Sequence, residues 1–191
     1  MSSSTPPPGS GTVTVADLRA ALERMESDAA LVARALGDRA SLDLGSVHPD
    51  VTADLATRLL TVADRATASA TVAVGQVTAV VGPATGTLIA GTYASPNRWL
   101  QVDAGLAPSH AKAVLARGRD LHEHSEPVSR AWLAGDISGD SVRELTSGIS
   151  GALKVVTAPR EEKARLREEA VEVLLPVAIA GTPADLKRGV A

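Results

Sequence analysis

Two stretches of the chain repeat the same order of residue types. In each, a tryptophan–leucine pair is followed by a short turn and then by a second expected helix. The turn contains one aliphatic residue, which is Leu106 in the first stretch and Ile137 in the second. This order is typical of helix-turn-helix units, in which the aliphatic residue holds the two helices together and the second helix faces a DNA groove. The chemistry that these stretches predict is contact with the phosphate backbone, which does not require that bases be read.

The second helix of the first stretch carries the better candidates for DNA contact. Its polar residues are Ser109, His110, Lys112, Arg117 and Arg119. The corresponding helix of the second stretch offers Asp140, Ser141, Arg143 and Glu144. Acidic side chains oppose the approach of phosphate, so we expect the first stretch to make the contacts. The alternative interpretation is that both stretches are packing motifs, because short helices joined by tight turns are common in small α-domains.

Other kinds of chemistry find little support in the sequence. His122 and His124 are two residues apart, which places them on different faces of a helix, and the chain contains no cysteine to complete a metal site. The glycines between Gly82 and Gly86 lack the lysine and serine or threonine of a phosphate-binding loop. Carboxylate pairs such as Glu161-Glu162 alternate with basic residues, as on a solvated helix face. We therefore expect no catalytic residue, metal ligand or cofactor.

The charge balance limits any interaction with nucleic acid. The chain of 191 residues carries 19 basic and 22 acidic residues, which gives a net charge of −3. An independent DNA-binding domain usually has a basic excess. Any phosphate contact must therefore depend on a few well-placed residues, with modest and salt-sensitive affinity.

Two long helices are predicted before these stretches. The first has an apolar stripe with alternating spacings of three and four residues, formed by Val15, Leu18, Leu22, Met25, Ala29, Val32 and Leu36, and Gly37 ends it. The second begins near Pro49 and Asp50, and its stripe consists of Leu55, Leu59, Val62, Ala66, Ala73, Val77 and Val80. The two stripes predict an antiparallel hairpin. Such a hairpin is either ordinary packing within the chain or an arm for dimerisation or partner docking.

Shorter helices are expected for the remainder, at about 96–103, 109–124, 126–134, 139–156, 159–179 and 183–188. Their expected N-caps are Ser109, Ser125, Ser138 and Thr182. The fold class is therefore all-α. We expect a disordered tail at 1–11, a long hairpin at 12–94 and a bundle of short helices at 95–191, with the hairpin and the bundle in one continuous domain. The low-charge window between Arg65 and Arg98 contains polar residues and a Gly-Pro break, so no membrane span is expected.

Several signatures follow one another as in a known family. They are Gly91-Thr92-Tyr93-Ala94-Ser95, Trp99-Leu100, Gly105 through Ala111, Pro127 through Ser138, and Thr182 through Leu186. With these in order, the chain resembles the actinobacterial domain of unknown function 222 over about residues 50–190. Members of that family commonly continue into an HNH endonuclease module with clustered Cys and His residues. The chain has no cysteine, so the resemblance transfers no catalytic residue to it.

These observations lead to one expectation and one alternative. The first is a non-catalytic helical module of an HNH-endonuclease-associated protein that assists the binding or positioning of double-stranded DNA. Its partners would be duplex DNA and a nuclease module. The alternative is a protein-interaction or oligomerisation scaffold that acts through the N-terminal helices. The first residues lack the basic start and apolar stretch of a secretory signal, so a cytoplasmic location is expected.

Overall fold

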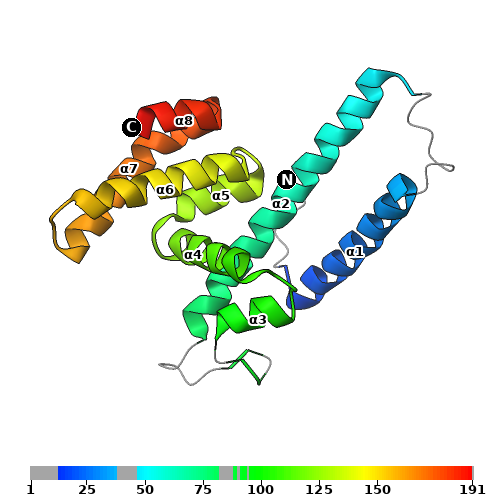
Figure 1. Ribbon diagram of the computed structural model, residues 1–191, viewed down its shortest axis with the longest axis horizontal. Coiled ribbons are helices and arrows are strands. Elements are labelled where there is room, and N and C mark those ends of the chain that lie inside the picture. Colours follow the sequence, from blue (N-terminus) through cyan, green and yellow to red (C-terminus); the bar gives the residue numbers. More distant parts are fainter. Residues whose placement is uncertain (1–12, 38–46, 82–87, 90, 94, 191) are drawn as a thin grey trace, which may run out of the picture. The chain divides into compact units, whose positions relative to one another are not determined.

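The computed structural model describes residues 13–37, 47–81, 88–89, 91–93 and 95–190. Within these ranges the chain forms eight α-helices (Figure 1). They are α1 (Val15–Gly37), α2 (Pro49–Val80), α3 (Pro96–Val102), α4 (Pro108–His124), α5 (Glu126–Ala134), α6 (Gly139–Val155), α7 (Arg160–Ala180) and α8 (Pro183–Val190). The predicted all-α class is confirmed, and most helix ends lie within a residue or two of the expected positions.

The described residues contain little besides helix. Their β pairing consists of one isolated bridge between Ile89 and Tyr93. None of the helices in the described ranges combines the length and the apolar character that crossing a membrane requires. The tail expected at 1–11 lies outside the described residues.

The chain divides into two compact units at a point inside α2. The first unit runs from Met1 to Leu55 and the second from Ala56 to Ala191. The sequence predicts a hairpin at 12–94 and a bundle at 95–191 within one continuous domain. The difference has a physical reason: the second half of α2 contributes Ala68 and Val74 to the core that the short helices share.

In the first unit, α1 starts with a well-defined set of hydrogen bonds. The Asp17 carboxylate accepts from the Thr14 N–H at 2.9 Å and from the Thr14 hydroxyl at 2.7 Å, and the Asp17 N–H donates to the Thr14 hydroxyl at 3.2 Å. This reciprocal arrangement satisfies amide groups that a helix start leaves without partners. None of the 23 residues of α1 is buried. Its pairing with α2 in a hairpin remains a prediction.

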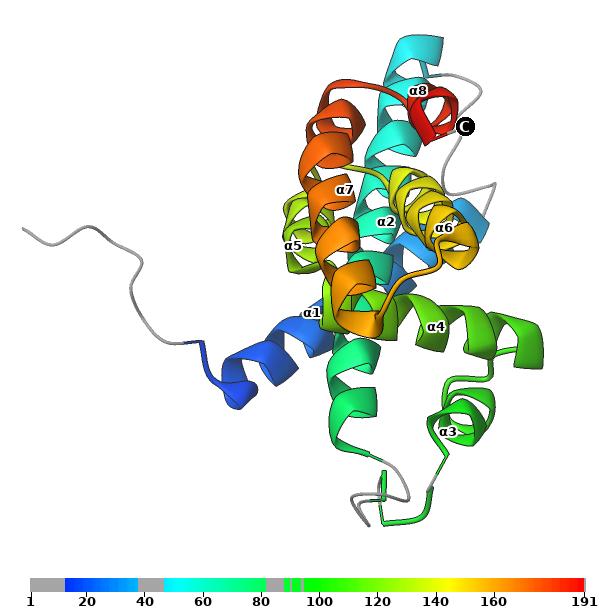
Figure 2. The same cartoon turned by 90° about the vertical axis from the view of Figure 1, so that its left-hand side faces the viewer.

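The second unit has two hydrophobic clusters, and a tryptophan belongs to each. The larger one surrounds Trp132, which is fully buried, and draws on α2 and α4 to α8. The smaller one joins Val74 of α2 to α3 and α4, with Trp99 packed against it. Figures 1 and 2 show α6, α7 and α8 next to one another, while α4 lies between that group and α3. Helices α2 and α4 both contribute residues to the two clusters and so connect them.

The face that α2 turns toward these clusters differs from the predicted stripe. None of the stripe residues is buried, and the buried residues of α2 lie on the opposite side of the helix. They are Ala68, Thr71, Val74 and Gly75. Small residues are favoured here because α2 and α4 approach closely: a Cβ atom added at Gly118 would lie 2.8 Å from the Thr71 carbonyl oxygen. The α2 stripe therefore does not pack into the second unit's core.

Candidate functional site

The first helix-turn-helix-like unit consists of α3, a turn at 103–107 and α4. Ser95 caps α3, since its hydroxyl accepts from the Arg98 N–H at 3.5 Å. Gly105 has a φ of 63°, a conformation that suits glycine in this turn. The Leu106 N–H donates to the Leu100 carbonyl at 3.1 Å, and the Leu106 side chain packs on the cluster shared by α3 and α4. The aliphatic residue of the turn thus joins the two helices, as predicted.

The second helix-turn-helix-like unit consists of α5, a turn at 135–138 and α6. Gly135 ends α5 with a φ of 83°, and its N–H donates to the Trp132 carbonyl at 3.0 Å. Ile137 in the turn is only 4% exposed. The Ser138 hydroxyl accepts from the Ser141 N–H at 3.2 Å, which confirms the predicted N-cap of α6.

A carboxylate from α2 fixes this second turn. Asp64 accepts from the Trp132 indole N–H at 3.2 Å and from the Gly139 N–H at 3.1 Å. The Gly139 N–H belongs to the first turn of α6, where a negative charge is favourable. Asp64 therefore anchors the turn between α5 and α6 to α2.

The five candidate contacts all lie on α4, but they occupy different parts of its surface. Lys112 and Arg119 are seven residues apart, about two turns, and so share one edge of the exposed face. His110 and Arg117 share the opposite edge for the same reason. Ser109 lies between the two edges. Arg117 is half-buried and the other four are exposed.

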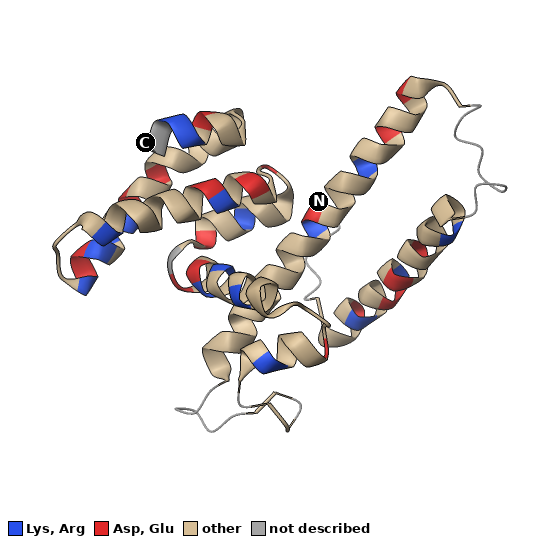
Figure 3. Cartoon of the chain, viewed as in Figure 1, with Lys and Arg blue, Asp and Glu red and all other residues tan. Residues whose placement is uncertain are grey.

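Small residues fill the exposed face between these two edges. Ala113 and Ala116 are both exposed and lie on the same side as Ser109. The opposite side of α4 is buried in the clusters through Ala111, Leu115 and Gly118. From Pro108 to Arg119 the helix contains no acidic residue, and Figure 3 shows the basic residues following one another along it. The N-terminal part of α4 is thus a narrow face with basic edges.

The start of α4 differs from the prediction. Ser109 was expected as the N-cap, but the helix begins at Pro108 and its N-cap is Ala107, which makes no side-chain hydrogen bond. Proline is favoured at the first position of a helix, because the missing N–H would have no partner there and the φ of proline is already helical. Ser125 does occupy the N-cap of α5, but its side chain makes no capping hydrogen bond there. The first amides of α4 therefore have no capping side chain.

Arg117 lines a pocket with a second arginine, Arg143, which the sequence did not predict as a contact. Arg117 of α4 and Arg143 of α6 line one pocket of about 270 Å³, together with Asp64 and Asp140. Burial, followed by repulsion from Arg143, lowers the pKa of Arg117, while Asp140 opposes the shift. Arg143 pairs with Asp140 at 3.2 Å, whereas Arg117 makes no ion pair with a described residue. Arg143, from the second helix-turn-helix-like unit, thus adds a basic side chain beside the edge of α4 that Arg117 occupies.

Toward its C-terminal end α4 becomes acidic and is held by α7. Arg167 of α7 donates to the Asp120 carboxylate, and the two side chains are only 17% and 19% exposed. Glu123, one turn further along, is exposed. The basic character of α4 is therefore confined to its first three turns.

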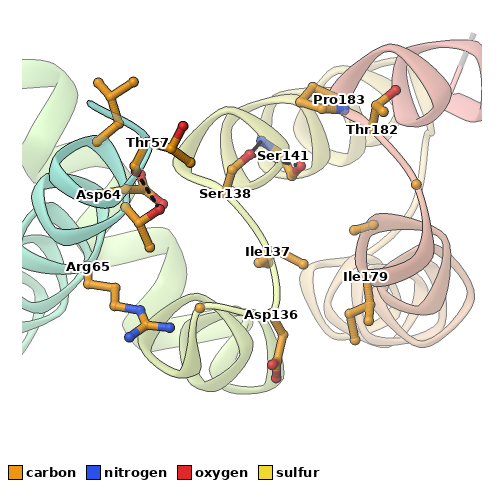
Figure 4. A pocket seen from close by; sticks show the side chains of 15 residues that line it. Thr57, Asp64, Arg65, Asp136, Ile137, Ser138, Ser141, Ile179, Thr182 and Pro183 are labelled. Atoms are coloured by element: carbon orange, nitrogen blue, oxygen red, sulfur yellow. Dashed lines mark hydrogen bonds between the residues drawn. The ribbon is translucent and has the colours of Figure 1, made fainter. Parts of the chain in front are cut away.

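A larger cleft of about 500 Å³ lies beside the second turn. Figure 4 shows its lining side chains, with Thr57, Asp64 and Arg65 from α2, Ser138 and Ser141 around the start of α6, and Ile179, Thr182 and Pro183 around the junction of α7 and α8. Arg65 lies over Gly135, where an added Cβ would be 2.7 Å from the guanidinium Nε. Across the described ranges, no three His, Asp or Glu residues are grouped to hold a metal ion. The cleft beside the turn thus has a mixed lining in which apolar surface predominates.

The resemblance to the domain of unknown function 222 remains a prediction. No family model, no curated protein and no solved structure matches the chain.

Proposed function

We propose that the chain is a non-catalytic helical module that binds double-stranded DNA through the first three turns of α4. The observation that carries this proposal is the distribution of side chains around that helix. Ser109, Ala113 and Ala116 form its exposed centre, Lys112 and Arg119 one edge, and Arg117 with the neighbouring Arg143 the other. Small side chains allow a helix to lie deep in a major groove, while basic edges meet the two phosphate backbones that border the groove.

The start of α4 supports the same proposal. Amide groups at a helix N-terminus bind phosphate well when no side chain competes for them, and the N-cap Ala107 offers no such side chain. In helix-turn-helix proteins the N-terminal residues of the second helix make the DNA contacts. His110 and Ser109 occupy that part of α4.

The overall charge of −3 predicts that this binding is weak and sensitive to salt. Four basic side chains are available, and Asp140 and Glu123 are close enough to reduce their effect. Contacts with phosphate dominate such an interface, so we expect little preference for base sequence. Weak, sequence-tolerant binding suits a protein that positions DNA for another activity. It does not suit a transcriptional regulator, which must recognise particular base sequences.

The wider role rests on the family resemblance. If the chain belongs with HNH-endonuclease-associated proteins, the helical module holds the DNA and a nuclease module cuts the DNA. Both modules then act in the cytoplasm, where the DNA is. The chain itself contains no cysteine for the metal cluster of such a module. The nuclease is therefore assigned to a separate module.

The test is binding of a fluorescent duplex of about two helical turns, followed by anisotropy at about 50 mM salt. The paired change of Lys112 and Arg119 to alanine should weaken binding at least about tenfold, and so should the paired change of Arg117 and Arg143. The control pair is Arg160→Ala with Arg165→Ala, which removes the same charge from exposed positions of α7. Equal effects of all three pairs would show that only net charge matters and would contradict the assignment to α4.

A further inference from the structure

The apolar stripe of α1 has no function in the DNA-binding proposal. Its members are exposed to a large extent, with Leu18 at 57%, Leu22 at 49% and Met25 at 46%. Helices in proteins gain most of their stability from packing of an apolar face, and α1 has no buried residue. Something must therefore cover this stripe when the protein is folded.

We propose that the stripe is covered by α1 of a second copy of the chain, in antiparallel orientation. The alternation of three and four residues continues through all seven members of the α1 stripe, which is the spacing of a two-stranded coiled coil. Helix α2 is a less regular match. With Ala70 included, its apolar residues from Val62 to Ala73 have spacings of four, four and three, which breaks the alternation. The most regular partner for α1 is thus α1 itself.

An antiparallel pair centred between Leu22 and Met25 places six of the seven stripe residues opposite one another, and Leu36 lies beyond the paired layers. In each layer the two residue numbers sum to the same value. The layers are Val15 with Val32, Leu18 with Ala29, and Leu22 with Met25, each occurring twice through the two-fold symmetry. Large residues face smaller ones in the layer of Leu18 and Ala29, which favours interlocking packing.

The charges beside the stripe favour the same register. Arg19 and Glu26 lie seven residues apart on one edge of the stripe. In the antiparallel pair this edge faces the same edge of the other copy, so that Arg19 of each copy lies next to Glu26 of its partner. A parallel pair places neither residue opposite a charge of the other sign. Charge complementarity therefore selects both the partner and the orientation.

The first measurement is the mass of the full chain in solution, by light scattering over micromolar concentrations. We expect a dimer, with twice the 19.5 kDa of the chain, that dissociates on dilution. A mass of 19.5 kDa at every concentration would overturn the proposal and leave α2 of the same chain as the cover for α1.

The second measurement uses charge exchange on α1. Arg19→Glu should raise the dimer dissociation constant about tenfold, since it replaces two attractive pairs by two repulsive ones. Adding Glu26→Arg to that variant should restore the original constant. Arg24→Glu is the matched control, because it changes the charge equally on the opposite face of α1 and should leave the constant unchanged.

The rescue distinguishes the antiparallel pair from other arrangements. Arg19 and Glu26 are about two turns apart within one helix and do not contact each other there. If the double variant dimerises no better than Arg19→Glu alone, the antiparallel register is wrong. Helicity measured by circular dichroism at the same concentrations shows whether each variant retains its helices.

Discussion

The carboxylate of Asp64 accepts a hydrogen bond from the indole N–H of Trp132, although the two residues are 68 positions apart. Trp132 is fully buried, so its N–H depends on this acceptor. The same carboxylate accepts from the Gly139 N–H at the start of α6. One side chain of α2 thus serves both the core tryptophan and the turn of the second helix-turn-helix-like unit.

Replacing Asp64 should therefore destabilise the compact unit that spans residues 56–191. Asp64→Ala leaves two buried or half-buried N–H groups without an acceptor, and we expect a loss of about 2 kcal/mol in the free energy of unfolding. The measurement is urea denaturation followed by Trp fluorescence. Asp136→Ala, an exposed carboxylate in the same turn, is the control and should change stability by less than about 0.5 kcal/mol. Equal midpoints for the two variants would contradict the anchoring role of Asp64.

The close approach of α2 and α4 gives a second prediction. At Gly118 an added Cβ would lie 2.8 Å from the Thr71 carbonyl oxygen and 2.9 Å from the Gly75 nitrogen, both backbone atoms. Gly118→Ala must push the helices apart, and we expect it to cost about 2 kcal/mol. Gly151→Ala in α6 meets no atom within 4 Å and should stabilise the protein by about 0.5–1 kcal/mol, because alanine favours helix. Stabilisation by both changes in thermal melts would disprove the tight contact.

The ion pair between Asp120 and Arg167 should matter more than its exposed counterparts on α7. Removing one member of a largely buried pair leaves the other in a poorly solvated place, so Arg167→Ala should lower the free energy of unfolding by about 2 kcal/mol. Arg165→Ala removes an exposed pair with Glu169, whose side chains are 67% and 58% exposed, and should cost less than about 0.5 kcal/mol. If the two variants unfold at the same denaturant concentration, the Asp120 pair contributes no more than a surface pair.

The hydrogen bonds at the start of α8 predict that the stability of this helix depends on pH. The hydroxyl and then the backbone N–H of Thr182 donate to Asp185 and hold the pKa of that carboxyl below its ordinary value. A lowered pKa in the folded state stabilises α8 above the ordinary carboxyl range, and this contribution is lost as the pH falls through the lowered value.

Carboxyl titration by NMR tests this arrangement. Thr182→Val removes the hydroxyl but keeps the N–H, and it should raise the pKa of Asp185 toward the ordinary value. Thr14→Val, in the equivalent pair with Asp17, should raise the pKa of Asp17 and leave that of Asp185 unchanged. If the pKa of Asp185 does not change in Thr182→Val, the Thr182 hydroxyl is not the cause of the lowered pKa.

Local features of the fold were predictable from the sequence because their causes are local. The turn aliphatics, the Ser138 cap and the start of α8 at Pro183 each depend on residues within one or two turns. Ser109 shows how such a prediction fails by one position, since Pro108 is the better first residue of a helix.

The contacts that assemble the site were not predictable in the same way. Nothing in the spacing of Asp64 indicates a partner 68 residues away. The docking face of α2 did leave a signal, since Ala68, Thr71 and Gly75 are small residues at helical spacing, but the larger residues of the opposite stripe obscured it. The acidic neighbours of Arg143 disfavour phosphate contact by sequence alone, and only the fold brings Arg143 to the pocket of Arg117.

The salt dependence of DNA binding tests the central claim most directly. Four phosphate contacts, from Lys112, Arg117, Arg119 and Arg143, predict that log K for duplex binding falls with log salt concentration at a slope of about −3.6. Each paired alanine variant should reduce that slope by about 1.8. No retention of duplex DNA at low salt, or the same slope after all four residues are changed, would contradict the account.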